Sequence, residues 1–158
     1  MAEFKIDGFD RLQVSIADMA MTPPETVLTE VILPAAEAMV EAMCDSINSY
    51  GLILSRWLLG SIKILTRYAG AKGVWADVGP DQGRHPKSTQ GLRKPRAQGG
   101  RGGHYSGTNA EVGFILEYGT SRIPAYHWME QAVRNVTDDI YDLMASGWYA
   151  ILERRWAA

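Results

Sequence analysis

The sequence predicts an α+β fold: a long N-terminal helix packed on a small antiparallel sheet, with C-terminal helices and a long basic loop. Apolar residues recur at helical spacing from Val27 to Ile47, and polar and apolar residues alternate from Ser61 to Tyr68. Residues 80–109 are dense in glycine, proline, lysine and arginine. At 158 residues, we expect a single domain spanning 1–158 with the flexible 80–109 loop inside it.

Two helices are predicted before residue 51. Phe9, Leu12 and Ile16 fall at helical spacing and indicate a short amphipathic helix. Thr22 is expected to cap the next helix, whose first turn tolerates the two prolines that follow because the amides there have no helical partner.

The long helix has one apolar stripe, at positions 27, 28, 31, 32, 35, 36, 39, 40, 43, 44 and 47. Pro34 interrupts it, so either the helix kinks there or a new helix begins, because proline removes one backbone hydrogen bond. Gly51 is expected to end the helix in the left-handed conformation of a C-terminal cap.

Three strands are predicted after the long helix. Residues 52–59 fit a helix or a turn, and residues 61–68 alternate as a strand. AGAKG predicts a turn into a second strand, VWADVG, that ends at Gly79-Pro80. The apolar run EVGFILEY, residues 111–118, predicts a third, mostly buried strand.

Two helices are predicted at the C-terminal end. AYHWMEQAVRN follows the turn GTSRIP with a helical pattern. Thr137 is expected to cap a further helix, with Asp138 and Asp139 near its N-terminus and Arg154 and Arg155 at its other end, where the dipole favours those charges.

Charge is distributed unevenly although the net charge is only −2. Residues 1–50 carry −7, residues 51–110 carry +8 and residues 111–158 carry −3. This separation suits subunits that meet their own copies, acidic helix against basic loop, and it also fits solvated faces without a partner. Six cations share the loop with a single acidic residue, Asp81: Arg84, Lys87, Arg93, Lys94, Arg96 and Arg101.

No catalytic, cofactor-binding or metal-binding residues are predicted, and we expect a protein that is not an enzyme. Cys44 is the only cysteine and lies on the apolar stripe, where a thiol usually behaves as a small hydrophobe. His85 and His104 lack metal-ligand spacing, and His127 is expected to pack or cap a helix. GGRGG matches no phosphate-binding motif.

The sequence predicts neither export nor a membrane span. Its start, MAEFKIDGFD, lacks a positively charged segment leading into an apolar one, so no signal peptide is expected. Acidic residues interrupt the longest apolar stretch. The single cysteine gives no sign of an oxidising compartment.

Residues 117–128 predict a fixed turn between the third strand and the next helix. Gly119 permits a backbone turn closed to other residues, Thr120 or its neighbour can cap, and Pro124 stiffens the entry to the helix. Trp128 is expected to anchor that helix, with core packing as the alternative role for the aromatic residues. With the six loop cations, the residues expected at a subunit interface are Glu117, Tyr118, Gly119, Thr120, Arg122, Pro124 and Trp128.

An apolar segment, Glu117-Tyr118-Gly119-Thr120-Ser121, Pro124-Ala125 and an aromatic-led helix together resemble a family of tailed-bacteriophage proteins. These are the small tail-component proteins of long-tailed phages, often called gene-product-ten-like. Gly8-Phe9-Asp10-Arg11-Leu12 resembles the family's opening, and the long helix before Gly51 fits its usual order. The chain departs from the family where His127-Trp128 stands in place of a frequent Pro-Phe pair.

The resemblance implies a structural virion protein that forms a homo-oligomeric ring, with a hexamer favoured, at the phage neck. There it would complete the tail or join head to tail, as a virion component assembled in the host cytoplasm. The implied partners are copies of itself, the adjacent head-tail connector, and tail-tube or tail-terminator proteins. Contact with packaged DNA is left open, and no membrane is implied.

A small nucleic-acid-binding protein is the alternative. Lysine and arginine in a glycine-rich chain can follow phosphates with little sequence preference. Only Tyr105 in the loop could stack on a base, which weakens this interpretation. A loop that contacts another subunit is therefore favoured.

Overall fold

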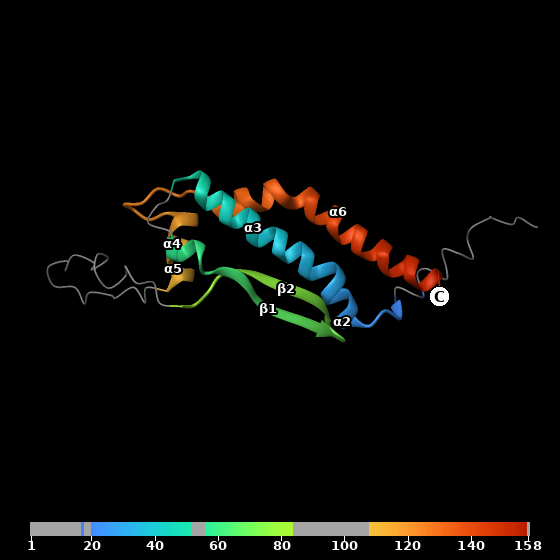
Figure 1. Cartoon of the computed structure of the whole chain (residues 1–158). Helices are drawn as coiled ribbons and strands as arrows, with labels where there is room; N and C mark the ends of the chain where they lie inside the picture. The colour runs from blue at the N-terminus through green and yellow to red at the C-terminus, as the bar shows by residue number, and fades with distance from the viewer. Residues whose placement is uncertain (1–16, 18–19, 52–55, 84–107, 158) are drawn as a thin grey trace, which may run out of the picture.

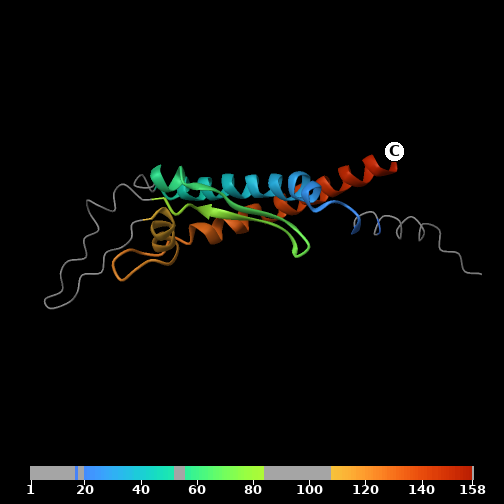
Figure 2. The same cartoon turned by 90° about the horizontal axis from the view of Figure 1, so that it is seen from below.

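A computed structural model describes residues 17, 20–51, 56–83 and 108–157 of the chain. The elements in chain order are α2 (Pro24–Val27), the π-helical turn η1 (Leu28–Ile32), α3 (Leu33–Ser49), α4 (Arg56–Leu59), β1 (Ile62–Gly70), β2 (Gly73–Pro80), α5 (Asn109–Tyr118) and α6 (Trp128–Trp156) (Figure 1). The fold is α+β, as predicted, with the N-terminal helical run packed on a two-stranded antiparallel sheet. Figure 1 shows α3 running between the hairpin and α6, and Figure 2 shows the same elements from below.

The N-terminal helical run passes through Pro34 without ending. The preceding turn is π-helical, and the Leu33 amide reaches back to the Leu28 carbonyl, so the extra residue falls just before the proline. Pro34 then occupies the first turn of α3, where its missing donor costs little. Gly51, with φ of 60°, ends α3 as predicted.

The predicted cap at Thr22 is wrong. α2 begins at Pro24, and the capping position is Pro23, which offers no side-chain hydrogen bond. Proline at the first helical position has a suitable φ and lacks the amide that a cap would have to satisfy. The predicted helix through Phe9, Leu12 and Ile16 lies outside the described residues.

The first two predicted strands are confirmed and form a hairpin. β1 and β2 pair antiparallel from Ile62 opposite Pro80 to Gly70 opposite Gly73, with the register shifting at Leu65. The shift inserts one extra residue in β1, a bulge that bends and twists the ribbon. Tyr68 and Trp75 pair across the strands with their rings stacked 4.1 Å apart.

The predicted third strand is wrong, because residues 109–118 form helix α5. The Thr108 hydroxyl caps this helix by accepting a hydrogen bond from the Glu111 amide at 3.2 Å. The buried positions are Asn109, Gly113 and Glu117, which repeat at helical spacing. An apolar run of eight residues fits either a strand or a buried helix, and the capping threonine is the one local feature that favours the helix.

The C-terminal end is one continuous helix, α6, and not two helices separated at Thr137. The Thr137 side chain donates a hydrogen bond to the Val133 carbonyl at 2.6 Å, one turn back, as an internal threonine does. No glycine or proline before Thr137 ends the helix there. The Thr137 side chain therefore does not act as an N-terminal cap. Arg154 and Arg155 lie in the last turn, as predicted.

The main core lies toward one end of the molecule, where the second half of α3 meets α4, the start of β1 and the start of α6. Its buried members are Met43, Ile47, Leu58, Ile62, Trp128 and Ala132. The buried Ser46 hydroxyl donates to the Trp128 carbonyl at 2.7 Å and ties α3 to α6 there. None of the described helices has the length and apolar character needed to cross a membrane.

A second contact joins α6 to the N-terminal run at Gly147. A Cβ atom there would lie 2.5 Å from the Glu30 carbonyl oxygen and 3.2 Å from the Val31 Cα. The two backbones therefore approach closely where α6 crosses η1. Arg154 pairs with Glu30 on the same side, farther along α6.

Replacing Gly147 with alanine is expected to lower the free energy of unfolding by about 2 kcal/mol, because the new methyl group meets backbone atoms that cannot rotate away. Helix propensity alone predicts the opposite sign, a gain of up to about 1 kcal/mol. Urea unfolding of Gly147→Ala would measure the difference, with Ala150→Gly reporting propensity at an exposed position. A more stable Gly147→Ala protein would contradict the close crossing.

Candidate assembly surfaces

The turn after α5 folds back on itself through a glycine, as predicted. Gly119 has φ of 73°, and a Cβ there would lie 2.7 Å from the Ala125 amide nitrogen and 2.8 Å from the Ile123 carbonyl oxygen. The Thr120 hydroxyl accepts hydrogen bonds from the Arg122 and Ile123 amides at 3.2 and 3.1 Å. Only glycine fits this backbone and this space.

Glu117 is not at an exposed edge, which corrects the prediction. It is only 4% exposed, and its carboxylate accepts the Met129 amide at 2.7 Å and the Glu130 amide at 3.2 Å. The residue at the capping position of α6, His127, has a left-handed backbone and supplies no capping side chain. The carboxylate from α5 therefore caps α6 from a separate helix.

Trp128, another predicted interface residue, is fully buried in the core. Its indole nitrogen donates to the Gly113 carbonyl at 3.0 Å, which a buried tryptophan needs to satisfy its donor. The core alternative therefore holds for this aromatic residue. Four of the predicted turn residues remain exposed: Tyr118, Thr120, Arg122 and Pro124. The Tyr118 ring lies 4.6 Å from that of Phe114, also exposed, so the two form a small aromatic surface on α5.

Glu117→Gln is expected to lower the free energy of unfolding by about 2 kcal/mol. One amide oxygen replaces two carboxylate oxygens, so a donor at the start of α6 is left facing the amide NH₂ in a buried place. Urea unfolding followed by circular dichroism would measure the loss. Glu153→Gln, at an exposed position of the same helix, is the control. Equal stabilities of the two variants would contradict the capping role.

Asp81 holds together the two chain segments that border the basic loop. Its carboxylate accepts hydrogen bonds from Lys63 Nζ at 2.8 Å, Asn109 Nδ2 at 2.8 Å and the Gly83 amide at 2.9 Å. The Asn109 amide also donates to the Gly83 carbonyl at 2.9 Å, and the Ala110 amide to the Asp81 carbonyl at 3.0 Å. The base of the loop is therefore fixed between β2 and α5.

The six predicted contact cations, Arg84, Lys87, Arg93, Lys94, Arg96 and Arg101, lie outside the described residues. We call residues 84–107 the basic segment. It contains six cations and no acidic residue. Asp81, the acidic residue that the sequence analysis assigned to the loop, lies at the base of this segment. Its carboxylate already accepts hydrogen bonds from Lys63 and Asn109.

Hydrogen bonds from Lys63, Asn109 and Gly83 lower the pKa of Asp81 from 3.8 to about 2. A lowered folded-state pKa adds stability that is fully present above the unfolded value and is lost as the pH falls through the folded value. We therefore expect Asp81→Asn to be less stable than the wild type at pH 7, with the difference shrinking from about pH 4 toward pH 2.

Urea midpoints of the wild type and Asp81→Asn across that range would test this linkage. Asp138→Asn, an exposed change of the same charge on α6, is the control. A difference between wild type and Asp81→Asn that stays constant down to the acid end of the range would contradict it.

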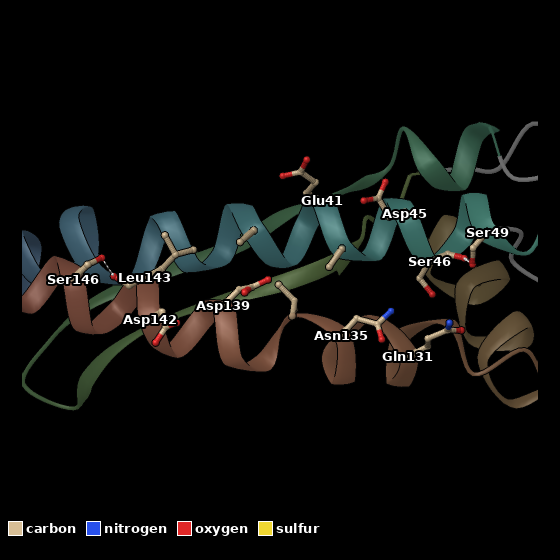
Figure 3. Close-up of a pocket in the computed structure, with 13 residues that line it drawn as sticks. Glu41, Asp45, Ser46, Ser49, Gln131, Asn135, Asp139, Asp142, Leu143 and Ser146 are labelled. Atoms are coloured by element: carbon tan, nitrogen blue, oxygen red, sulfur yellow. Dashed lines mark hydrogen bonds between the residues drawn. The ribbon is translucent and has the colours of Figure 1, made fainter.

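An open groove of about 860 Å³ runs between α3 and α6 (Figure 3). Four exposed carboxylates line it, from Glu41 and Asp45 of α3 and Asp139 and Asp142 of α6. Its apolar lining residues are Ala38, Ala42, Val136 and Leu143. No lysine or arginine is among the described residues of this lining. Sequence reasoning found the acidic N-terminal helix but assigned Asp139 to a helix start, and so missed that α6 adds a second acidic wall.

The middle of α6 carries exposed large side chains on the faces that do not contact α3 and η1. The buried residues of α6 lie at its two ends, and none of the residues between Val136 and Ile151 is buried. Tyr141 and Tyr149 are each 67% exposed there, and Leu143 is also exposed. Large apolar side chains gathered on one helix in this way are typical of protein interfaces.

Two potentially reactive side chains, Cys44 and His127, lie in the described part of the chain. Burial, with the charges of Asp45 and Glu41, raises the pKa of Cys44, which reduces its thiolate content at neutral pH. Glu117, His127 and Glu130 each bring one potential metal-ligand atom within 4.8 Å of the others. Both Glu117 oxygens already accept amides at a helix N-terminus, whose positive potential opposes a cation.

The chain matches no protein-family model, no curated protein and no solved structure in the comparisons made. The resemblance of its turn segment to phage tail-component proteins therefore stays a prediction from the sequence.

Proposed function

We propose that this protein is a structural subunit of a long-tailed bacteriophage, and that it assembles into a homo-oligomeric ring at the neck of the virion. There it completes the tail or joins head to tail, next to connector and tail-tube or tail-terminator proteins. The family resemblance of residues 117–125 supports the phage assignment, and the surface of α6 supports self-assembly.

The observation that carries the proposal is the exposure of large apolar side chains along the middle of α6. A helix anchored at both ends by buried residues, yet exposing Tyr141, Leu143 and Tyr149 between them, has an apolar surface that the monomer leaves in water. Burying such a surface against another subunit is favourable in proportion to the apolar area removed from water. A structural ring needs this kind of permanent contact.

Charge separation supports a ring over a two-fold dimer. A closed ring uses two different complementary patches on each subunit, so that one subunit's first patch meets its neighbour's second patch. The groove carboxylates and the basic segment are two patches of opposite sign in one chain. A two-fold dimer would instead place the same patch against itself.

Negative-stain electron microscopy of lysates from a phage with an early stop in this gene would test the function. We expect filled heads beside separate tails, with intact virions restored when the gene is supplied from a plasmid. Abundant intact virions without the protein would remove the neck role.

Nucleic-acid binding is the second candidate, favoured by six cations that emerge from one fixed base at Asp81. Binding would weaken steeply with salt, because each neutralised phosphate releases counterions. Fluorescence anisotropy with labelled DNA and RNA over a salt series measures it. Failure to bind either at low salt removes this candidate and leaves the assembly role unaffected.

A further inference from the structure

We infer that the groove between α3 and α6 is the docking site for the basic segment, residues 84–107, of a second copy of this chain. Neighbouring subunits would then be joined head to tail, with each subunit giving its segment to one neighbour and receiving that of the other. This inference rests on the proposed self-assembly and names the surface through which it occurs.

The four groove carboxylates are available for a partner. In the described part of the chain, Glu41, Asp45, Asp139 and Asp142 form no ion pair, whereas Glu30 and Glu130 are paired with Arg154 and Arg134. All four carboxylates line the same groove. In Figure 3, Glu41 and Asp45 project from the side of α3 that lies away from α6, and Asp139 lies between the two helices. Cations placed along the groove would offset the repulsion between these like charges.

The shape of the groove suits an extended, glycine-rich chain. Ala38 and Ala42 are small, so the backbone of a docked segment can approach α3 closely. Leu143, which is exposed, offers apolar surface to the methylene stems of arginine and lysine, whose charged heads can then reach the carboxylates at the rim. The basic segment contains six glycines along with its six cations, so few bulky side chains oppose this approach.

A second copy fits better than the chain's own segment. The segment's base lies at the end of β2 and the start of α5, held by Asp81. The hairpin ribbon passes behind the helix pair in Figure 3, while the groove faces forward. The groove thus opens on the face away from the hairpin, and a neighbour's segment can approach that open face directly.

Photo-cross-linking would locate the segment. A benzophenone amino acid is placed at Ala42 in the groove, and at Lys72 in the exposed hairpin turn as the control position. Equal amounts of ¹⁴N- and ¹⁵N-labelled protein are mixed after unfolding and refolding, irradiated, digested and analysed by mass spectrometry. We expect Ala42 to cross-link to peptides from residues 84–107, with hybrid light–heavy pairs present. The Lys72 position should not reach those peptides.

Cross-links that join only peptides of the same isotope would show that the segment binds its own chain, and would overturn the inference. Cross-links from Ala42 to other parts of the chain, or none at all, in a protein that assembles would also overturn it while leaving the proposed ring intact. A wild-type protein that stays monomeric at all concentrations would remove self-assembly in solution and this inference together.

Charge variants give an independent readout by analytical ultracentrifugation. Asp139→Asn with Asp142→Asn is expected to weaken self-association about tenfold at low salt, and less at high salt, because exposed ion pairs are screened. Asp138→Asn, an exposed residue of the same helix outside the groove lining, should have no such effect.

A charge exchange tests the pairing itself. Asp139→Lys with Asp142→Lys, and separately Arg93→Glu with Arg96→Glu, should each self-associate poorly. A mixture of the two variants should regain one strong contact, because the unchanged basic segment of the groove variant meets the unchanged acidic groove of the segment variant. If the groove variants associate as tightly as the wild type, the segment docks elsewhere.

Discussion

The position of α6 depends on one buried carboxylate. Glu117, at the end of α5, accepts the amides of Met129 and Glu130 and so closes the N-terminus of a helix that has no cap of its own. The same helix supplies Trp128 to the core and one wall of the acidic groove. A displacement at this end would therefore alter the core and the groove together.

Two further contacts complete the frame. Ser46 ties α3 to the carbonyl of Trp128 near the first end of α6, and the close backbone approach at Gly147 fixes the crossing with η1. Between these points the helix pair is open on one face. The groove and the exposed Tyr141 both lie along this stretch, so this part of α6 has surface to offer a neighbour.

The basic segment and the groove differ in how they are prepared for contact. The groove is built on two long helices, which hold its carboxylates at set positions. The segment is fixed at its base, where Asp81 joins β2 to α5, and its composition of glycine and cations favours adaptation to a surface. A groove held in place by two helices and a segment that can adapt to it suit subunits that first associate and then form a permanent contact.

The sequence by itself determined the long apolar helix to Gly51, the hairpin, the sites of charge and the glycine turn at residue 119, because each rests on local spacing or on a residue with a special backbone. It also carries the resemblance to phage tail-component proteins. The tertiary structure decided the rest. Residues 111–118 became a helix because Gly113 and Glu117 find partners in Pro80, Trp128 and the start of α6. Glu117 caps α6, and Asp139 lines the groove, because helices far apart in the chain pack together at those residues. Such long-range contacts produce no local sequence pattern from which they could be predicted.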